Sequence, residues 1–349
     1  MKFVVASFAP QLSKKIFRSD INALRAWAVM SVVFYHFAVP GFSGGFVGVD
    51  VFFVISGFLM TGIIVEGLEK KEFSLVEFYF ARLRRIMPGL AALCGVVLII
   101  GWFLLAPDDY VQMAEHVRDA LLFSSNNTFR KEAGYFDALS HDKWLLHTWS
   151  LSVEWQFYML LPLLLYLLWS IRKSIRWLFG FLLFLGCLSF IACVFKTETD
   201  AAKAFFTLKF RCWEMIFGGV VYFISCLNNS RAKYSIFIFY LGSLLVLLSV
   251  VFIDGENIWP GYLALMPVIG ASLIVYASRQ DVLFNNVFFV QWIGSRSYSI
   301  YLWHWPIVVL LAYFQISESV AWVCLGILVS LLLGPVSYTH LRAHETVLD

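Results

Sequence analysis

The sequence predicts an all-α, polytopic integral membrane protein with about ten transmembrane helices. Of its 349 residues, 60% are hydrophobic and only 14% are charged, whereas soluble domains carry about 25% charged residues. The mean hydropathy is +0.78. The apolar residues also fall into separate runs close to the ~20 residues that cross a bilayer.

Ten apolar stretches are candidate membrane spans. They are 21–39, 49–66, 87–106, 150–170, 177–195, 205–226, 234–253, 259–277, 297–314 and 319–336. Basic residues gather in every second connection, including Lys14, Lys15, Lys70, Lys71, Arg172, Lys173, Arg231 and Arg279. Because cytoplasmic loops carry an excess of Lys and Arg, we expect both termini in the cytosol.

The chain divides into three parts by composition. Residues 1–18 form a cytosolic lead, and residues 19–336 form the transmembrane domain. Residues 337–349 are polar and unrelated in character to the apolar stretch before them. We interpret this segment as a non-native or read-through tail, expect it to be loosely attached, and expect the native chain to continue.

Composition also argues against several classes of site. The six cysteines lie in apolar stretches without a Cys-x-x-Cys pair, which is typical of small buried hydrophobic residues. We therefore expect no disulfide framework and no metal site. The net charge of +3 is too small to indicate nucleic-acid binding.

Arg25 and His36 are the most informative residues of the first apolar stretch. Ionisable groups at membrane depth are costly, so they usually mark a functional site. Eleven residues are close to three helical turns, which places both side chains on one face, about 16 Å apart along the axis. The pair therefore predicts a site that extends across part of the bilayer.

Five motifs follow one another along the chain. They are Arg18–His36, Gly48–Phe58, Phe78–Pro88, Thr148–Tyr158 and Ser297–His304. Together they resemble the membrane acyltransferase type 3 family over residues 18 to about 335. The resemblance implies a ten-helix enzyme of the bacterial inner membrane. Such enzymes move an acyl group, typically acetyl, from cytosolic acetyl-CoA to hydroxyls of a surface glycan such as lipopolysaccharide O-antigen or exopolysaccharide.

The same resemblance implies the partners. They are an acyl-CoA donor, a surface or lipid-linked glycan acceptor and membrane lipid, with neither a metal nor nucleic acid. In some relatives a soluble SGNH-type domain follows the membrane part, and truncation would have removed such a domain from this chain.

His36, Arg25 and Asp50 are the first catalytic candidates. Acyl transfer to a hydroxyl needs a base near neutral pH, which His36 fits; the alternative is a hydrogen-bonded core histidine. Arg25 keeps its proton, so it is an anion partner, a stabiliser of developing charge, or a snorkelling residue. Asp50 follows the glycine-rich turn 41–48, and either caps a helix or orients His36.

Arg82, Arg84 and Arg85 are candidates for binding the phosphates of CoA. Ser74-x-x-Glu77 fits a capping box that starts a helix here, and residues three apart share a helix face, as Arg82 and Arg85 do. Guanidinium groups suit phosphates. Anchoring to anionic lipid is the alternative. Many relatives have a basic residue where this chain has Ala81.

Two polar stripes complete the predicted site. His147, Glu154 and Tyr158 form one, in which Glu154 binds acceptor hydroxyls, orients a base or pairs with an arginine. The other stripe contains a second candidate acid or base; its members are Ser297, Tyr301 and His304. Arg211 and Glu214, three residues apart, are expected to form a structural ion pair.

The competing function is that of a transporter or flippase. Its intramembrane charges would be substrate ligands or proton relays. The arginine cluster and the lack of evident repeat halves favour the enzyme.

Overall fold

The computed structural model describes residues 17–133, 142–227 and 235–342. Within these ranges the regular elements are helices, as the sequence predicts. In chain order they are α1 (Ser19–His36), η1 (Gly45–Val47), α2 (Gly48–Lys70), α3 (Leu75–Leu104), α4 (Pro107–Leu121), α5 (Ser125–Glu132), α6 (Thr148–Ile171), α7 (Ile175–Thr199), α8 (Ala201–Phe206), α9 (Leu208–Leu227), α10 (Ser235–Phe252), η3 (Tyr262–Ala264), α11 (Leu265–Ala277), η4 (Leu283–Asn286), α12 (Phe288–Tyr313) and α13 (Val320–Arg342).

A helix occupies each of the ten predicted spans, but the helices are not equally suited to lipid. Among the described residues, six are long and apolar enough to cross a membrane, namely α2, α3, α6, α7, α9 and α10. The apolar parts of α11 and α13 are shorter. Helices α1 and α12 do not reach that apolarity, because they carry the polar candidate residues and pack against each other inside the bundle.

Several predicted boundaries were wrong. The long loop after α3 contains the amphipathic helices α4 and α5. The helix expected to start after Ser74 and the predicted span 87–106 form one continuous helix, α3. Ser74 caps its first turn, because the Ser74 side chain accepts a hydrogen bond from the backbone N–H of Glu77. Helix α13 continues through residues 337–342, so the compositional break at 337 is not a structural end. Residues 1–16 and 343–349 lie outside the described ranges.

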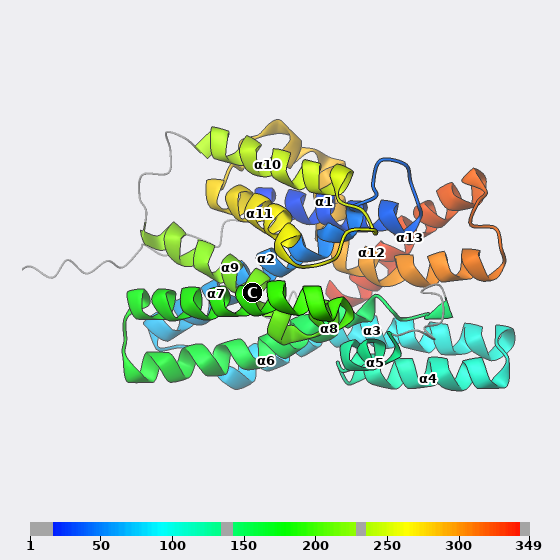
Figure 1. The fold of residues 1–349 in the computed structure, drawn as a ribbon, viewed down its shortest axis with the longest axis horizontal. Helices are drawn as coiled ribbons and strands as arrows, with labels where there is room; N and C mark the ends of the chain where they lie inside the picture. The colour runs from blue at the N-terminus through cyan, green and yellow to red at the C-terminus, as the bar shows by residue number, and fades with distance from the viewer. Residues whose placement is uncertain (1–16, 134–141, 228–234, 343–349) are drawn as a thin grey trace, which may run out of the picture.

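Helix α2 is the centre of the bundle. It packs against α1, α6, α9 and α11, and 78% of its apolar window is buried, against 28% for the peripheral α7. Figure 1 shows α10 and α11 on one side of this centre and α6 and α7 on the other. Helices α3, α4 and α5 lie together towards one end.

Glycines let α2 and α9 approach closely. A Cβ atom at Gly57 would overlap the carbonyl oxygen of Met215, and one at Gly218 would overlap that of Val54. Small residues at such crossings are typical of helix pairs in membranes, where close packing replaces the hydrophobic driving force. The crossing therefore sets which polar residues of α2 and α9 lie opposite each other.

Gly57→Ala is expected to destabilise the bundle by about 1–3 kcal/mol, the usual cost of overpacking. The matched control is Gly180→Ala, because a Cβ there meets nothing within 4 Å and alanine is the better helix former. Thermal unfolding of the two purified variants in one detergent measures the difference. Equal melting temperatures would show that the crossing tolerates a methyl group.

The turn between α1 and α2 folds back into the bundle. A Cβ at Gly48 would overlap the carbonyl oxygen of Ala28, eight residues before the end of α1, or about 12 Å at 1.5 Å per residue. Non-helical backbone at membrane depth must find partners within the protein. The Gly44 N–H donates to the Val250 carbonyl at the end of α10 (2.9 Å).

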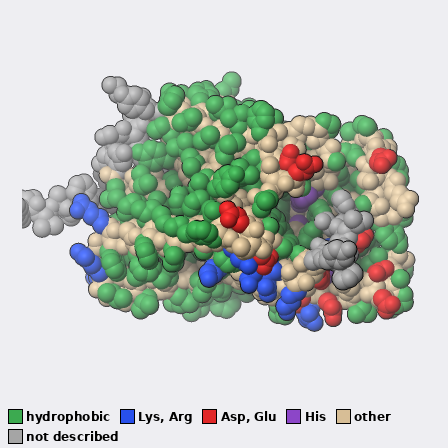
Figure 2. All heavy atoms as spheres, in the orientation of Figure 1, with side chains coloured by type: hydrophobic (Ala, Val, Ile, Leu, Met, Phe, Trp, Pro, Cys, Tyr) green, Lys and Arg blue, Asp and Glu red, His purple; other side chains and the backbone are tan. Residues whose placement is uncertain are grey.

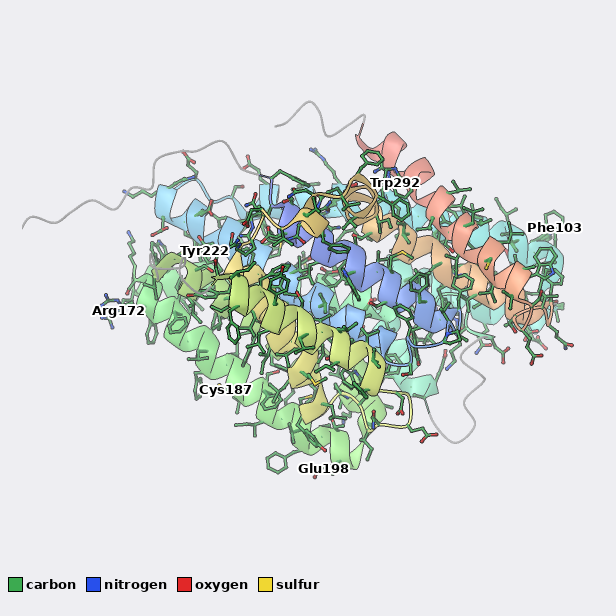
Figure 3. The ribbon with its side chains drawn as sticks, turned by 90° about the horizontal axis from the view of Figure 1, so that it is seen from above. Phe103, Arg172, Cys187, Glu198, Tyr222 and Trp292 are labelled. Atoms are coloured by element: carbon green, nitrogen blue, oxygen red, sulfur yellow. The ribbon has the colours of Figure 1, made fainter. Side chains whose placement is uncertain are left out.

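The two ends of the bundle differ. Figure 3 places Arg172 and Phe103 at opposite ends. On the face shown in Figure 2, apolar side chains cover the left and centre, some Lys and Arg lie at the left end and more along the lower edge from centre to right, and most Asp and Glu lie over the right half. An apolar band between two polar ends is the surface expected of a protein that spans a bilayer.

Candidate functional site

Helices α1 and α12 carry the centre of the site. The face of α1 that carries Arg25 and His36 contacts the polar residues of α12 at two separate positions along the helices. The Arg25 Nε–H donates to Ser297 Oγ at 3.1 Å. At the C-terminal end of α1, the Nδ1 atom of His36 lies 2.9 Å from Nε2 of His304. The sequence therefore predicted two faces that the fold brings into contact.

The two levels are separate. Ser297 and His304 are seven residues apart, which is about 10 Å along a helix. Arg25 therefore does not reach the imidazole of His36, so a shared reaction centre for Arg25 and His36 is not what the structure supports. Arg25 lines a pocket that lies towards the N-terminal end of α1 from the histidines.

The empty space inside that pocket, together with the open solvent at its mouth, amounts to about 820 Å³. Its polar and charged lining residues are Arg25, Ser56, Arg82, Arg85, Ser150, Glu154, Tyr158, Ser297, Tyr298 and Tyr301. Three guanidinium groups face one carboxylate there, a net formal charge of +2. Apolar side chains of α2, including Phe52 and Phe53, supply much of the remaining wall.

Glu154 is the single acidic residue among the groups that line this pocket. Its Oε1 accepts hydrogen bonds from the hydroxyls of Ser56 on α2 and Tyr158 one turn further along α6. These two donors hold the carboxylate in place in a pocket that is otherwise cationic. The structure thus brings Glu154 and Tyr158 together as their spacing on α6 predicts.

Tyr301 lies between the pocket and the histidines. It lines the pocket, and its hydroxyl donates to the carbonyl of His147 (2.9 Å) and lies 2.7 Å from Ser150 Oγ. Behind it the ring of His304 lies 5.8 Å from that of His147. His304 is fully buried and His147 is 3% exposed. Neither ring nitrogen of His147 has a hydrogen-bond partner among the described residues.

Helices α4 and α5 and the segment before α6 support these three histidines, which we call the histidine cluster (His36, His147 and His304). His116 on α4 lies 2.8 Å from Glu132 at the end of α5, and Lys143 is 3.5 Å from the same carboxylate. The backbone carbonyl of Lys143 accepts from the Trp305 indole N–H at 2.8 Å, and the Trp305 ring meets His36 edge-on. Figure 2 shows histidine side chains at the surface right of centre.

The arginines of α3 divide as helix geometry requires. Arg82 and Arg85 line the pocket, and the Arg82 guanidinium lies over the ring of Phe78. Arg84 is exposed and does not line the pocket. Residues three apart share a helix face but the residue between them does not, so Arg84 lies apart from the pocket and its part in CoA binding stays a prediction.

Asp50 belongs to a different arrangement from the predicted one. It neither caps α2, whose N-cap is Val47, nor lies among the pocket residues. Its Oδ1 accepts from Arg211 at 2.9 Å, and Arg211 lies 3.1 Å from Glu214. All three side chains are at most 1% exposed. The predicted Arg211–Glu214 ion pair is confirmed, and Asp50 completes it as a buried charge cluster.

Sequence reasoning missed four residues of the site. Ser56, Ser150 and Tyr298 line the pocket, and Trp305 holds the His36 ring. All four lie inside or beside the recognised motifs. Serine in an apolar helix usually bonds its own backbone, so spacing alone could not show that Ser56 faces a carboxylate from another helix.

The fold and the pocket define a helical membrane protein with a buried cationic site next to paired imidazoles. The chain belongs to the acyltransferase 3 family, whose model, described as an acyltransferase domain, matches residues 18–339. The predicted family is therefore confirmed.

Curated relatives agree with this assignment. The peptidoglycan O-acetyltransferase OatA of Listeria monocytogenes is 30% identical over 83% of this chain and 49% of its own length. The O-acetyltransferase OatA of Staphylococcus aureus is 30% identical over 92% of the chain and 56% of its own length. The putative peptidoglycan O-acetyltransferase YrhL of Bacillus subtilis is 29% identical over 91% and 53%. The chain spans about half the length of these relatives. No solved structure matches it.

Proposed function

We propose that the protein transfers an acetyl group from acetyl-CoA to a hydroxyl of a cell-wall glycan. The observation that carries this proposal is the pocket of net charge +2 that meets the histidine cluster at Tyr301. A cationic pocket suits a polyanionic donor, and a histidine suits proton transfer from a hydroxyl. Family membership favours this function over that of a transporter.

The donor is proposed to bind at the arginine end. Arg82 and Arg85 project from one face of α3 and fit phosphate groups, while Arg25 adds a third cation deeper in the pocket. Guanidinium groups bind phosphate bidentately. Glu154, held by Ser56 and Tyr158, limits the excess positive charge and offers an acceptor for donor or glycan hydroxyls.

His36 is proposed to act at the other end as general base. It takes the proton of the acceptor hydroxyl while that oxygen bonds to the thioester carbonyl carbon. The carbon–sulfur bond then breaks, and the His36 imidazolium returns the proton to the sulfur, so the products are the O-acetyl ester and free CoA. Tyr301 separates the pocket from His304. The Tyr301 side chain must therefore rotate away before the acyl group can move from the pocket to the histidine cluster.

The acceptor is proposed to be peptidoglycan, reached from outside a cytoplasmic membrane in which both termini face the cytosol. The names of two relatives specify peptidoglycan, whereas the expectation of lipopolysaccharide rested on the sequence motifs alone. Proteoliposomes enclosing acetyl-labelled acetyl-CoA, with glycan fragments outside, test the proposal. Label on peptidoglycan fragments is expected. Label on lipopolysaccharide alone would overturn the acceptor, and absence of transfer from a folded protein would overturn the activity.

Arg85→Gln is expected to raise the KM for acetyl-CoA about tenfold or more, since a hydrogen bond to a charged group contributes about 1.5–3 kcal/mol. Arg84→Gln is the matched control, because this neighbour is exposed as Arg85 is but lies outside the pocket. Initial rates at varied acetyl-CoA measure both. An equal change in the two variants would assign the arginines to membrane anchoring instead.

A further inference from the structure

The hydrogen bonds of His304 determine which nitrogen of His36 is basic. His304 Nδ1 lies 2.6 Å from the backbone carbonyl oxygen of Tyr301, and its Nε2 lies 2.9 Å from His36 Nδ1. A carbonyl oxygen only accepts hydrogen bonds, so Nδ1 of His304 carries a hydrogen. In neutral histidine the other ring nitrogen is then an acceptor.

His304 is neutral in this argument for a structural reason. Its side chain is fully buried, and its ring neighbours are His36, His147 and Tyr301. No carboxylate is among the partners that the described residues give it. An unpaired cation in such a place is costly, so a doubly protonated His304 is disfavoured.

We infer that His304 is a positioning residue that holds His36 in the Nδ1–H form and leaves Nε2 as its basic nitrogen. His36 Nδ1 must donate to His304 Nε2, because that atom is an acceptor. The ring plane is fixed from two further sides, by Trp305 at 4.7 Å and Tyr35 at 5.1 Å between ring centroids. The tautomer stands on geometry alone, whereas its catalytic use rests on the proposed function.

The arrangement also supports the charged intermediate. When Nε2 of His36 takes the hydroxyl proton, Nδ1–H becomes part of an imidazolium, and its bond to His304 becomes charge-assisted and stronger. His304 does not change its own protonation state in this step. Among the described residues, the other titratable groups in ring contact with the pair are His147, beside His304, and Tyr35, beside His36.

Nitrogen-15 NMR of the histidine-labelled protein tests the tautomer directly. The chain has seven histidines, so the His36 signals are assigned by their loss in His36→Gln. A protonated Nδ1 on His36 is expected in the wild type. His304→Leu is expected to shift the proton to Nε2, the form that free neutral histidine prefers. A wild-type His36 protonated at Nε2 would overturn the inference.

Kinetics test the consequence with a matched pair of variants. His304→Gln places an amide oxygen where Nε2 accepts, so kcat is expected to stay within about tenfold of wild type. His304→Leu removes the acceptor, and its kcat is expected to fall at least about 10²-fold, towards the range seen when a histidine is left in the wrong tautomer. Size-exclusion profiles and melting temperatures confirm that both variants fold.

The outcomes separate the two claims. Equal losses of kcat in the folded Gln and Leu variants would overturn the positioning role of His304. A wild-type Nδ1–H signal combined with an active His36→Gln enzyme would leave the tautomer standing and overturn the proposed use of His36 as the base.

Discussion

His36→Ala is expected to abolish acyl transfer while the protein still folds and enters the membrane. Removal of a general base typically costs 10²–10⁴-fold in rate, and His36 is the histidine whose ring Trp305, Tyr35 and His304 orient together. Release of CoA and acetyl transfer to glycan, measured in the same proteoliposomes, both report the loss.

Tyr35→Phe is the control for that variant. It changes the neighbouring residue of the same helix turn and retains an aromatic ring next to His36. Transfer close to the wild-type rate is expected for it. If His36→Ala keeps more than about a tenth of wild-type turnover, His36 is not the base.

Arg211→Met is expected to cause the largest loss of stability. The guanidinium lies between Asp50 and Glu214, and all three groups are excluded from solvent. Removing the cation leaves two buried carboxylates without a counter-charge, and breaking a buried pair in this way costs about 3–5 kcal/mol. Melting temperature and yield from membranes measure the effect.

Two further variants serve as controls for the Arg211→Met result. Arg118→Ala removes an arginine that is 61% exposed and whose hydrogen bond holds the pKa of Asp119 below its usual range; a loss below about 1 kcal/mol is expected. Asp50→Asn leaves Arg211 paired with Glu214, so folded protein should retain transfer. If it folds but is inactive, Asp50 takes part in the reaction after all.

The fold was largely predictable because hydropathy reports lipid exposure. The most apolar helices, such as α7 and α10, were predicted most directly. The predictions failed where helices do not face lipid. The amphipathic helices α4 and α5 lie beside the C-terminal end of α3, and hydropathy does not detect them. The 30-residue α3 itself runs from the arginine segment to that end without a break at Pro88.

Only the part of the site that depends on spacing within a single helix was predictable from the sequence. The stripes containing Arg25 and His36, Glu154 and Tyr158, and Ser297 and His304 follow from helical spacing. Which stripes meet depends on packing between distant helices, and this is why Asp50 was expected to cap a helix or to orient His36 rather than to pair with Arg211. The Ser56–Glu154 contact also joins residues 98 apart in the chain.

The turn that folds back between α1 and α2 bears on the order in which the protein assembles in the membrane. Its Gly44 N–H is satisfied by Val250, and Arg25 on the preceding helix bonds Ser297. Both partners leave the ribosome some 200 residues or more after the groups they satisfy. Until α10 has entered the membrane, the Gly44 N–H therefore lacks the Val250 carbonyl, and an unsatisfied backbone group is expensive in lipid. We expect α1 to reach its final position late, after α10 and α12 have entered, so that the face carrying Arg25 and His36 forms only in a fully inserted bundle.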